Sequence, residues 1–241
     1  MRVLMVGATG RHAHLVLREL TKRGVAVRAL VRNDERARVA RDNGAEETVV
    51  GDLMEPASLN EAVAGVAGVF HIGPAHAARE AEMGLAMVEA ARAAGVRKFV
   101  YSGVIHPSIS AMTNHAAAKL PVEEALYSSE LDFTVLQPAR FMQNFERSWN
   151  DVVEHDRLAQ PYSLTAKMCS VDYRDVAEVA AMAMTSVTSV TAHSNCALPG
   201  CRTPMKPRRS SVRSSGGPSP RCKYRFTSSL HNCPKGRSVM A

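Results

Sequence analysis

The residues best suited to chemistry stand near the start of the chain, where glycines interrupt an apolar stretch. Residues 3–13 read VLMVGATGRHA and join a strand-like segment to the start of a helix. Gly7 permits a tight reversal, Gly10 lets backbone N–H groups approach a phosphate, and the small Ala13 lets the helix pack closely on its strand. With the positive end of that helix, the turn is suited to bind a pyrophosphate. An ordinary strand–turn–helix also needs small residues, so the motif alone leaves that alternative open.

Arg32 bears on which dinucleotide such a turn would bind. It is the first polar residue after the second strand-like run, where an enzyme that prefers NAD usually has a carboxylate for the ribose hydroxyls. A guanidinium can instead pair with the 2′-phosphate that distinguishes NADP. The sequence therefore favours NADP over NAD. The alternative is an Arg32 that only ends a surface loop, with Asp34 near the ribose.

Two further strand-like runs end in residues that could contact a cofactor. Asp52 and Leu53 follow the third run, where a carboxylate and an apolar side chain could flank an adenine. Gly73 and Pro74 follow the fourth run, where the backbone can come close to the middle of the cofactor. A plain Gly-Asp turn is the alternative for the first pair. His71, within the fourth run, is expected in the core.

The elements that must position these residues alternate along the chain. Strand patterns cover residues 3–6, 25–31, 47–50, 68–72, 98–101 and 133–136. Helix patterns cover residues 15–23, 34–42, 58–63, 77–94 and 114–128. Six successive strand–helix units predict an α/β fold, a Rossmann-type doubly wound parallel sheet. In such a sheet ligands bind beyond the carboxyl ends of the strands, at the switch point.

The formal net charge of +7 comes from the last part of the chain. Residues 1–190 hold 20 Lys and Arg against 23 Asp and Glu, whereas residues 191–241 hold 10 Lys and Arg and no acid. The second segment also contains four of the five cysteines and shows neither helical nor strand periodicity. We therefore expect a largely disordered tail. A basic arm that binds nucleic acid is the alternative, which we rank last.

Cysteine spacing and the absence of targeting patterns bear on the setting of the protein. The tail cysteines lack C-x-x-C pairs, which argues against a zinc site, and Cys169 is expected in the core. No apolar run approaches the roughly 20 residues of a membrane helix. The N-terminus shows no secretory signal. We expect a cytoplasmic protein without a metal, a membrane or a nucleic-acid partner.

Several segments together resemble the NmrA-like family of atypical short-chain dehydrogenases/reductases, NAD(P)-binding proteins that include quinone reductases and redox-sensing regulators. The resemblance runs from residue 1 to about residue 185, with Ala13 at the usual third glycine. It includes VDYRDVA at 171–177, which predicts a strand end followed by a capped helix. The other matching segments are GATG at 7–10, Arg32, Gly51, Asp52, YSGV at 101–104, Lys119, PVEE at 121–124 and LQPARFMQN at 136–144.

The resemblance implies two catalytic candidates and a set of cofactor contacts. Lys119 matches the family lysine near the nicotinamide ribose, and His115 stands where ordinary short-chain dehydrogenases have a proton-donating tyrosine. One helical turn would separate the two, and imidazole can donate a proton near neutral pH. An exposed residue at a helix start is the alternative for His115. The expected cofactor-binding residues are Gly7, Thr9, Gly10, Arg11, His12, Arg32, Asp52, Leu53, Gly73, Pro74, Tyr101, Ser102, Lys119 and Pro138.

The sequence thus predicts an NADP(H)-binding oxidoreductase that transfers hydride to a quinone or a small carbonyl compound. The alternative is a non-catalytic NADP(H) sensor that acts through a regulatory protein partner. Residues 1–185 would form the NAD(P)-binding domain, and residues 186–241 the basic tail. Because the likeness stops abruptly after residue 185, we expect an incomplete or atypical C-terminal substrate region, such as a shifted reading frame or a truncated gene would produce.

Overall fold

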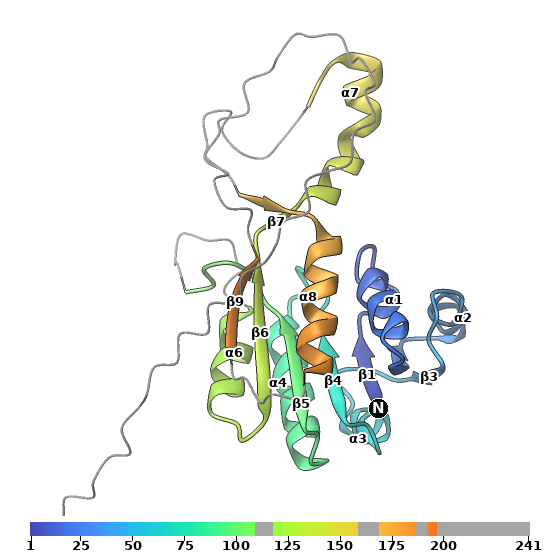
Figure 1. The fold of residues 1–241 in the computed structure, drawn as a ribbon, viewed down its shortest axis with the longest axis vertical. Coiled ribbons are helices and arrows are strands. Elements are labelled where there is room, and N and C mark those ends of the chain that lie inside the picture. Colours follow the sequence, from blue (N-terminus) through green and yellow to red (C-terminus); the bar gives the residue numbers. More distant parts are fainter. Residues whose placement is uncertain (109–117, 159–168, 187–191, 197–241) are drawn as a thin grey trace, which may run out of the picture. The chain divides into compact units, whose positions relative to one another are not determined.

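The computed structural model describes residues 1–108, 118–158, 169–186 and 192–196, the last as backbone only. Within these ranges a seven-stranded parallel sheet forms the centre of the fold (Figure 1). Its strands are β1 (Arg2–Val6), β2 (Ala26–Val31), β3 (Glu47–Val50), β4 (Gly68–His71), β5 (Lys98–Ser102), β6 (Asp132–Pro138) and β9 (Ala192–Cys196). A separate parallel pair consists of β7 (Arg140–Phe141) and β8 (Ser170–Val171).

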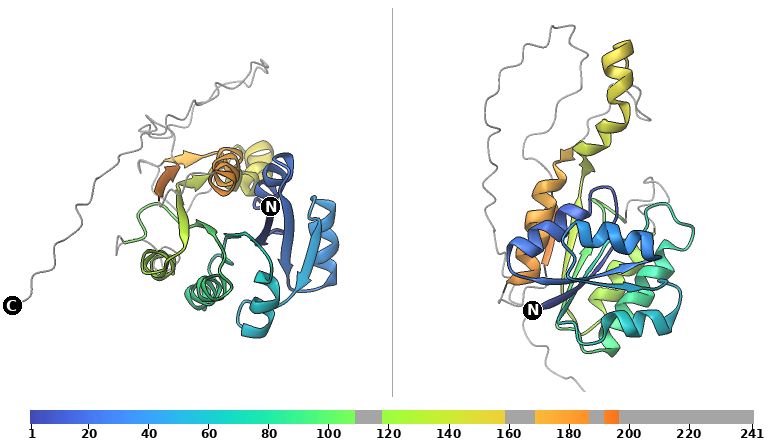
Figure 2. Two further views of the ribbon diagram at one scale, coloured as in Figure 1. Left: turned by 60° about the horizontal axis from the view of Figure 1, so that its bottom comes forward. Right: turned by 90° about the vertical axis from the view of Figure 1, so that its right-hand side faces the viewer.

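Helices cover both faces of the sheet, because its strands carry apolar side chains in both directions (Figure 2). On β1, Val3 and Met5 belong to one core, whereas Leu4 and Val6 belong to the other. The first core also contains side chains of α1 (His14–Lys22), α2 (Asp34–Asp42) and α8 (Tyr173–Thr185). The second contains side chains of α3 (Pro56–Val63), α4 (Glu80–Ala93) and α6 (Leu120–Tyr127).

The order of the strands, β3-β2-β1-β4-β5-β6-β9, reverses direction at β1. The chain moves outward from β1 to β2 and β3, then crosses to β4 on the other side of β1. Val6 of β1 pairs with Leu30 of β2 and with His71 of β4, so the loops that follow these strands leave from one edge. This is the switch point at which doubly wound sheets bind ligands.

The α/β fold and the six strands expected from the sequence are confirmed, with shifts of one or two residues at their ends. The capped helix after residue 171 is confirmed as α8, whose Asp172 side chain accepts a hydrogen bond from the N–H of Arg174. Of the expected helix 114–128, residues 114–117 lie outside the described residues. The structure places Ala118 and Lys119 in a turn and begins α6 at Leu120, so the expected helix is not continuous. Pro121 explains this start, since proline suits the first helical turn, where its missing N–H is not needed.

The region after β6 contains elements that the sequence did not predict. A 3₁₀ helix, η1 (Met142–Ser148), continues into α7 (Trp149–His155), and the two extend away from the sheet in Figure 1. β9 comes from the segment after residue 185, where no strand pattern was found, and pairs with β6 from Thr134 opposite Ala192 to Pro138 opposite Cys196. Residues 197–241, most of the expected tail, lie outside the described residues.

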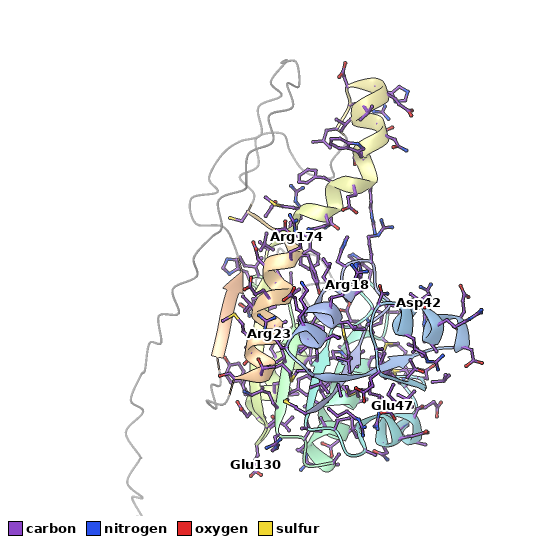
Figure 3. The ribbon with its side chains drawn as sticks, turned by 45° about the vertical axis from the view of Figure 1, so that its right-hand side comes forward. Arg18, Arg23, Asp42, Glu47, Glu130 and Arg174 are labelled. Atoms are coloured by element: carbon purple, nitrogen blue, oxygen red, sulfur yellow. The ribbon has the colours of Figure 1, made fainter. Side chains whose placement is uncertain are left out.

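The outer surface of the described part carries both charged and apolar side chains. Arg18, Asp42 and Glu130 are exposed on helices and loops around the sheet (Figure 3). Cys169 is exposed too, so the expectation that it lies in the core was wrong. None of the helices in the described ranges combines the length and the apolar character that a bilayer-spanning segment requires.

Candidate functional site

A cavity of about 590 Å³ lies beyond the carboxyl ends of β1, β2, β3 and β4. Its position coincides with the switch point of the sheet, so four separate loops contribute to its wall. The lining residues are Val6, Gly7, Thr9, Gly10, Arg11, His12, Ala13, Leu30, Val31, Arg32, Arg36, Gly51, Asp52, Leu53, Ile72, Gly73, Pro74, Ala75, Met83, Phe141 and Tyr173.

The glycine turn after β1 is built too tightly for side chains. Gly7 has a φ of +83°, and a Cβ on it would lie 2.6 Å from Ile72 Cγ2 and 2.9 Å from the Ile72 carbonyl oxygen. A Cβ on Gly10 would lie 3.0 Å from the Gly7 carbonyl oxygen, which already accepts the Gly10 N–H at 2.8 Å. The bare backbone therefore faces the cavity just ahead of α1. This arrangement fits a pyrophosphate, because side-chain-free backbone and the N-terminus of α1 border the same cavity.

Two guanidinium groups border the cavity beyond β2. Arg32 and Arg36 both line it and are exposed. Asn33 fixes the start of α2 between them, since its Oδ1 accepts the backbone N–H of Arg36 at 3.0 Å. Asp34, the alternative ribose partner, is not among the lining residues. The cavity therefore meets two cations and no carboxylate at the end of β2, which suits a phosphate group.

The loop after β3 presents Asp52 and Leu53 to the cavity. Asp52 Oδ1 accepts the backbone N–H of Met54 at 2.8 Å, while the Asp52 N–H donates to Ser58 Oγ at 3.2 Å. The first bond closes an Asx turn, and the second ties the loop to α3. The Gly-Asp turn that the sequence allowed is therefore present, and it places an apolar side chain and a carboxylate at the cavity rim.

Three aromatic rings, those of His12, Phe141 and Tyr173, form another part of the cavity wall. Phe141 and Tyr173 meet edge to face with ring centroids 4.6 Å apart, and His12 lies 5.9 Å from Tyr173. Gln143 holds the junction, because it accepts the Tyr173 N–H at 3.0 Å and donates to Asp172 Oδ1 at 2.7 Å. Burial lowers the pKa of His12 and raises the pKa of Tyr173. Both rings are therefore neutral near pH 7 and suit a flat, uncharged ligand.

A second group of polar side chains lies beside the loop that follows β4, and we call it the buried cluster. Lys119 Nζ lies 2.7 Å from Glu80 Oε1, and each residue is only 2 % exposed. Burial lowers the pKa of His71 to about 3 and raises the pKa of Tyr101, so both of these rings are neutral at pH 7. The members of the buried cluster are His71, Glu80, Tyr101, Ser102, Lys119, Glu123 and Gln137.

Glu123 is the titratable member of the buried cluster. Its Oε2 accepts a hydrogen bond from Gln137 Nε2 at 2.8 Å. Burial nevertheless raises the pKa of Glu123 to about 7, with Gln137 and then Lys119 opposing that rise. A Cβ on Gly103 would lie 2.4 Å from Glu123 Oε1, so the carboxyl packs directly on the backbone after β5.

A family comparison agrees with this geometry. The sequence model of the NmrA-like family matches residues 1–201. The chain belongs to the NmrA-like family. The match includes β9, which lies beyond the end of the resemblance read from the sequence.

Individual relatives of this NmrA-like chain have different reported roles. The NAD(P)H azoreductase of Xenophilus azovorans is 32 % identical over 177 residues, which cover 73 % of this chain and 61 % of the relative. The photosystem II assembly factor Ycf39 of Guillardia theta is 30 % identical over 150 residues, or 59 % of this chain and 48 % of the relative. The NADPH complex of the Escherichia coli quinone oxidoreductase QOR2 is similar in structure, with a TM-score of 0.69, 26 % identity and coverage of 77 % and 65 %.

The NmrA-like chain spans about half to two thirds of the length of these three proteins. The remaining third or more of each relative has no counterpart in the alignment.

The structure brings together most of the residues that the sequence assigned to a cofactor. Tyr101, Ser102, Lys119 and Pro138 are different, because they are buried and do not line the cavity. His115 lies outside the described residues. The assigned residues that do line the cavity are Gly7, Thr9, Gly10, Arg11, His12, Arg32, Asp52, Leu53, Gly73 and Pro74.

Sequence reasoning missed several lining residues of this NmrA-like chain, of which Arg36 and Tyr173 are the most polar. Arg36 could have been found, because Asn33 is a helix N-cap residue and places the side chain three positions later on the first turn of α2. Tyr173 carried no such signal. Its place in the wall depends on the packing of α8 against α1, which brings together segments far apart in the sequence.

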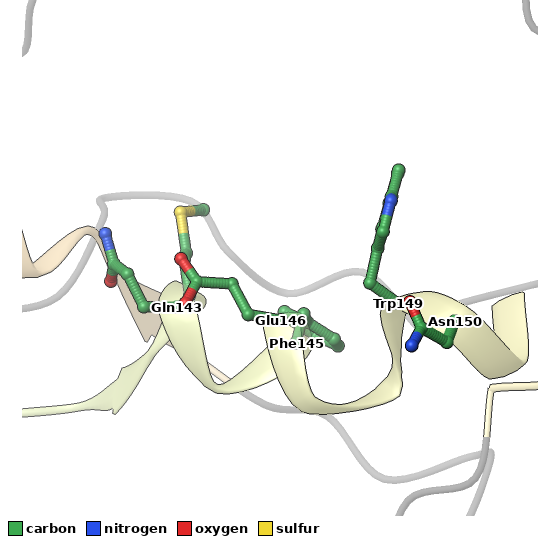
Figure 4. Close-up of a pocket in the computed structure, with 6 residues that line it drawn as sticks. Gln143, Phe145, Glu146, Trp149 and Asn150 are labelled. Atoms are coloured by element: carbon green, nitrogen blue, oxygen red, sulfur yellow. The ribbon is translucent and has the colours of Figure 1, made fainter. Parts of the chain in front are cut away.

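A shallower hollow of about 420 Å³ lies on η1 and α7 (Figure 4). Its lining comes from residues 142–150 alone, including Gln143, Glu146 and Trp149, which Figure 4 shows along one stretch of helix. One continuous segment cannot surround a dinucleotide. The cavity at the switch point is therefore the better candidate for a functional site.

Proposed function

We propose that this NmrA-like chain binds NADP(H) in the cavity at the switch point. The observation that carries the proposal is the meeting of a side-chain-free turn, Gly7 to Gly10, with two exposed guanidinium groups, Arg32 and Arg36, in one cavity. A pyrophosphate and a 2′-phosphate are the two anionic groups of NADP(H). Their separate binding needs correspond to these two parts of the wall.

The remaining lining residues have roles that follow from their chemistry. Leu53 would pack against the adenine, and Gly73 with Pro74 would bring backbone close to the centre of the cofactor. When bound, NADPH supplies the hydride of the reaction. The aromatic wall of His12, Phe141 and Tyr173 would orient a flat acceptor and exclude water from it.

We further propose that the chain is an oxidoreductase whose acceptor is a quinone or another small conjugated or carbonyl compound. The relatives named as an azoreductase and a quinone oxidoreductase support this class, since azo compounds and quinones are flat and conjugated. The neutral aromatic wall suits the same ligands. Lys119 and His115 remain proposed catalytic residues on the strength of the family resemblance.

Calorimetric titration with NADPH and NADH tests the binding proposal. We expect saturable binding of NADPH that is tighter than that of NADH, because only NADPH carries the phosphate that Arg32 and Arg36 can pair with. NADPH oxidation with a panel of benzoquinones, naphthoquinones and azo dyes then tests the activity. A folded protein that shows no heat with either coenzyme would refute the whole proposal.

A second candidate function is a non-catalytic NADP(H) sensor that acts through a protein partner. The burial of Lys119 against Glu80 favours it, because a lysine enclosed in an ion pair is not placed to assist a reaction in the cavity. A relative named as a photosystem II assembly factor, and not as a reductase, supports this alternative. NADPH binding without turnover of any acceptor would support the sensor over the enzyme.

A further inference from the structure

We infer that Tyr173 is a specificity-determining residue, whose hydroxyl binds a carbonyl oxygen of the acceptor, with His12 Nε2 as a second donor to the same oxygen. The site would then favour quinones and other conjugated carbonyl compounds over azo compounds. The inference rests on the proposed function, because it names the class of acceptor that the same cavity takes.

Two polar atoms of the cavity wall are buried without a hydrogen bond. They are Tyr173 Oη and His12 Nε2, and neither has a partner among the residues that the structure describes. Both side chains line the cavity, and their ring centroids lie 5.9 Å apart. A buried polar group without a partner lowers stability, so folded proteins keep few of them. Two such atoms side by side in a cavity wall indicate a ligand that completes their hydrogen bonding.

The fold positions the Tyr173 ring without using its hydroxyl. Gln143 Oε1 accepts the Tyr173 backbone N–H at 3.0 Å, and Gln143 Nε2 donates to Asp172 Oδ1 at 2.7 Å. Phe141 packs edge to face on the Tyr173 ring, with centroids 4.6 Å apart. Backbone and ring packing therefore fix the side chain, and the oxygen is left for another purpose.

The protonation of the two rings indicates which kind of atom they would bind. Burial raises the pKa of Tyr173, so the hydroxyl keeps its proton at pH 7 and can donate it in a hydrogen bond. Burial lowers the pKa of His12, and a neutral imidazole can donate from one of its nitrogens. A carbonyl oxygen has two lone pairs and can accept both bonds. An azo nitrogen has only one lone pair and can accept one.

A phosphate oxygen of the cofactor is the other acceptor that the cavity could bring to these donors. The guanidinium groups of Arg32 and Arg36 are exposed at the end of β2 and suit the charge of a phosphate. Tyr173 is instead 0 % exposed and lies among uncharged rings. A charged group loses more on leaving water for such surroundings than a carbonyl group does. A neutral oxygen is therefore the better match.

Phe141 lies between solvent and the Tyr173 hydroxyl in our interpretation. It is only partly buried, belongs to the two-residue strand β7, and contacts the rings of both His12 and Tyr173. Side-chain rotations of this kind are common when a ligand binds. A flat acceptor that displaces the Phe141 ring would reach the hydroxyl, which is closed to water until then.

The experiment compares full-length wild type with Tyr173→Phe, which removes one oxygen and keeps the ring. The two ligands are duroquinone, whose four methyl groups block the addition of thiols, and azobenzene, which contains no oxygen. Calorimetry measures each Kd with the protein saturated with NADP+, so that no hydride can be transferred. We expect Tyr173→Phe to weaken duroquinone binding about five- to tenfold and to leave azobenzene binding within about twofold of wild type. An unchanged Kd for duroquinone, or an equal loss for both ligands, would overturn the inference.

His12→Phe tests the second donor in the same way. It keeps a flat ring and removes Nε2, so it should weaken the binding of duroquinone and not that of azobenzene. An unchanged Kd for duroquinone would contradict the part assigned to His12.

Thermal unfolding of the free protein separates a ligand-binding hydroxyl from a structural one. A buried hydroxyl without a partner does not stabilise the fold, so Tyr173→Phe should have a melting temperature equal to or above that of wild type. A melting temperature several degrees lower, or a variant that does not fold, would show that the hydroxyl serves the fold and would contradict the inference.

Tyr127→Phe is the matched control, because it removes the same atom from a tyrosine elsewhere. Tyr127 is 55 % exposed at the end of α6 and does not line the cavity. We expect its Kd for duroquinone to equal that of wild type. A loss as large as that of Tyr173→Phe would show that the effect does not arise in the cavity.

The outcomes distinguish this inference from the proposed function. If wild type binds no NADP+, the proposed function fails, while duroquinone binding to the free proteins still tests Tyr173. If wild type binds NADP+ but no duroquinone, the inference is overturned and the binding proposal stands. If Tyr173→Phe loses affinity for NADP+ and not for duroquinone, the hydroxyl binds the cofactor, and the inference is again overturned.

Discussion

Two cationic regions border the carboxyl edge of the sheet, and they differ in what surrounds their charges. Arg32 and Arg36 are exposed at the cavity, and neither has an ion pair with a described residue. Lys119 is buried and paired with Glu80. An exposed guanidinium keeps its donors available for an incoming phosphate, whereas an enclosed ion pair holds protein segments together. Substitutions in the first region should therefore change ligand binding, and those in the buried cluster should change stability.

The strongest test of the open region is Gly7→Ala, with Gly24→Ala as its control. Both glycines have positive φ, +83° and +71°, but only at Gly7 would the new Cβ collide with other atoms. We expect Gly7→Ala to weaken NADPH binding about 10- to 100-fold, because strain and collision distort the phosphate turn. Gly24→Ala should lose only stability. Calorimetry and thermal unfolding of both variants check this, and equal affinities would show that the turn does not bind the nucleotide.

Arg32→Ala and Arg36→Ala test the cations of the open region. A charge-assisted hydrogen bond contributes about 1.5–3 kcal/mol, so each variant should lose roughly tenfold or more in NADPH affinity and almost nothing in NADH affinity. Arg38→Ala is the matched control. Arg38 is exposed on α2, as Arg36 is, but it does not line the cavity. Titration of each variant with NADPH and with NADH gives the ratio of the two Kd values, which measures the coenzyme preference. A preference for NADPH that survives both substitutions would exclude these guanidinium groups as its source.

Glu123→Gln tests the buried cluster through pH. The pKa of Glu123 is raised from its usual 4.5 to about 7, so the folded protein holds a proton that the unfolded chain has released. The stability from this group is therefore present below pH 4.5 and is lost as the pH rises to about 7, on the order of 3 kcal/mol in all. We expect Glu123→Gln to match wild type at pH 4.5 and to exceed it in stability at pH 8.

Denaturant unfolding of wild type and of Glu123→Gln at a series of pH values measures this difference in stability. His71 has the opposite effect, because its lowered pKa removes stability as the pH falls below 6.5. It is present in both proteins, so its contribution cancels in the difference between them. A difference that stays constant from pH 4.5 to 8 would show that Glu123 titrates at its ordinary value.

The smallest effect is expected at Trp149, which belongs to neither region. Its side chain is 63 % exposed on α7. We expect Trp149→Ala to change the free energy of unfolding by less than about 0.5 kcal/mol and to leave NADPH binding unchanged. Calorimetry measures NADPH binding, and denaturant unfolding measures the free energy of unfolding. A clear loss of NADPH affinity would mean that the ligand site extends from the cavity to the hollow on η1 and α7.

The parts of the site that could be predicted from sequence are those set by local backbone chemistry. The turn could be predicted because Gly7 has a backbone conformation and surroundings that only glycine fits, and Arg32 could be placed because it directly follows a strand. The strands followed from continuous apolar runs, which parallel sheets buried on both faces require.

The parts that could not be predicted depend on contacts between distant segments. Lys119 looked like a cofactor residue, and nothing near it in sequence indicates that Glu80, 39 positions earlier, encloses it. Tyr173 reaches the cavity only through the packing of α8 on α1. β9 has the sequence AHSNC, whose polar composition gives no strand signal, and its pairing with β6 decides its conformation.

That pairing has a consequence for how the molecule meets other chains. β6 is the longest strand of the sheet, and on the side away from β5 its backbone is matched over five positions, 134–138, by residues 192–196. An uncovered border of this length would present a row of N–H and C=O groups to any extended peptide. The five paired positions therefore place β6 inside the sheet and make β9 its edge strand, and a chain cut ahead of residue 192 would leave the longer β6 at that edge.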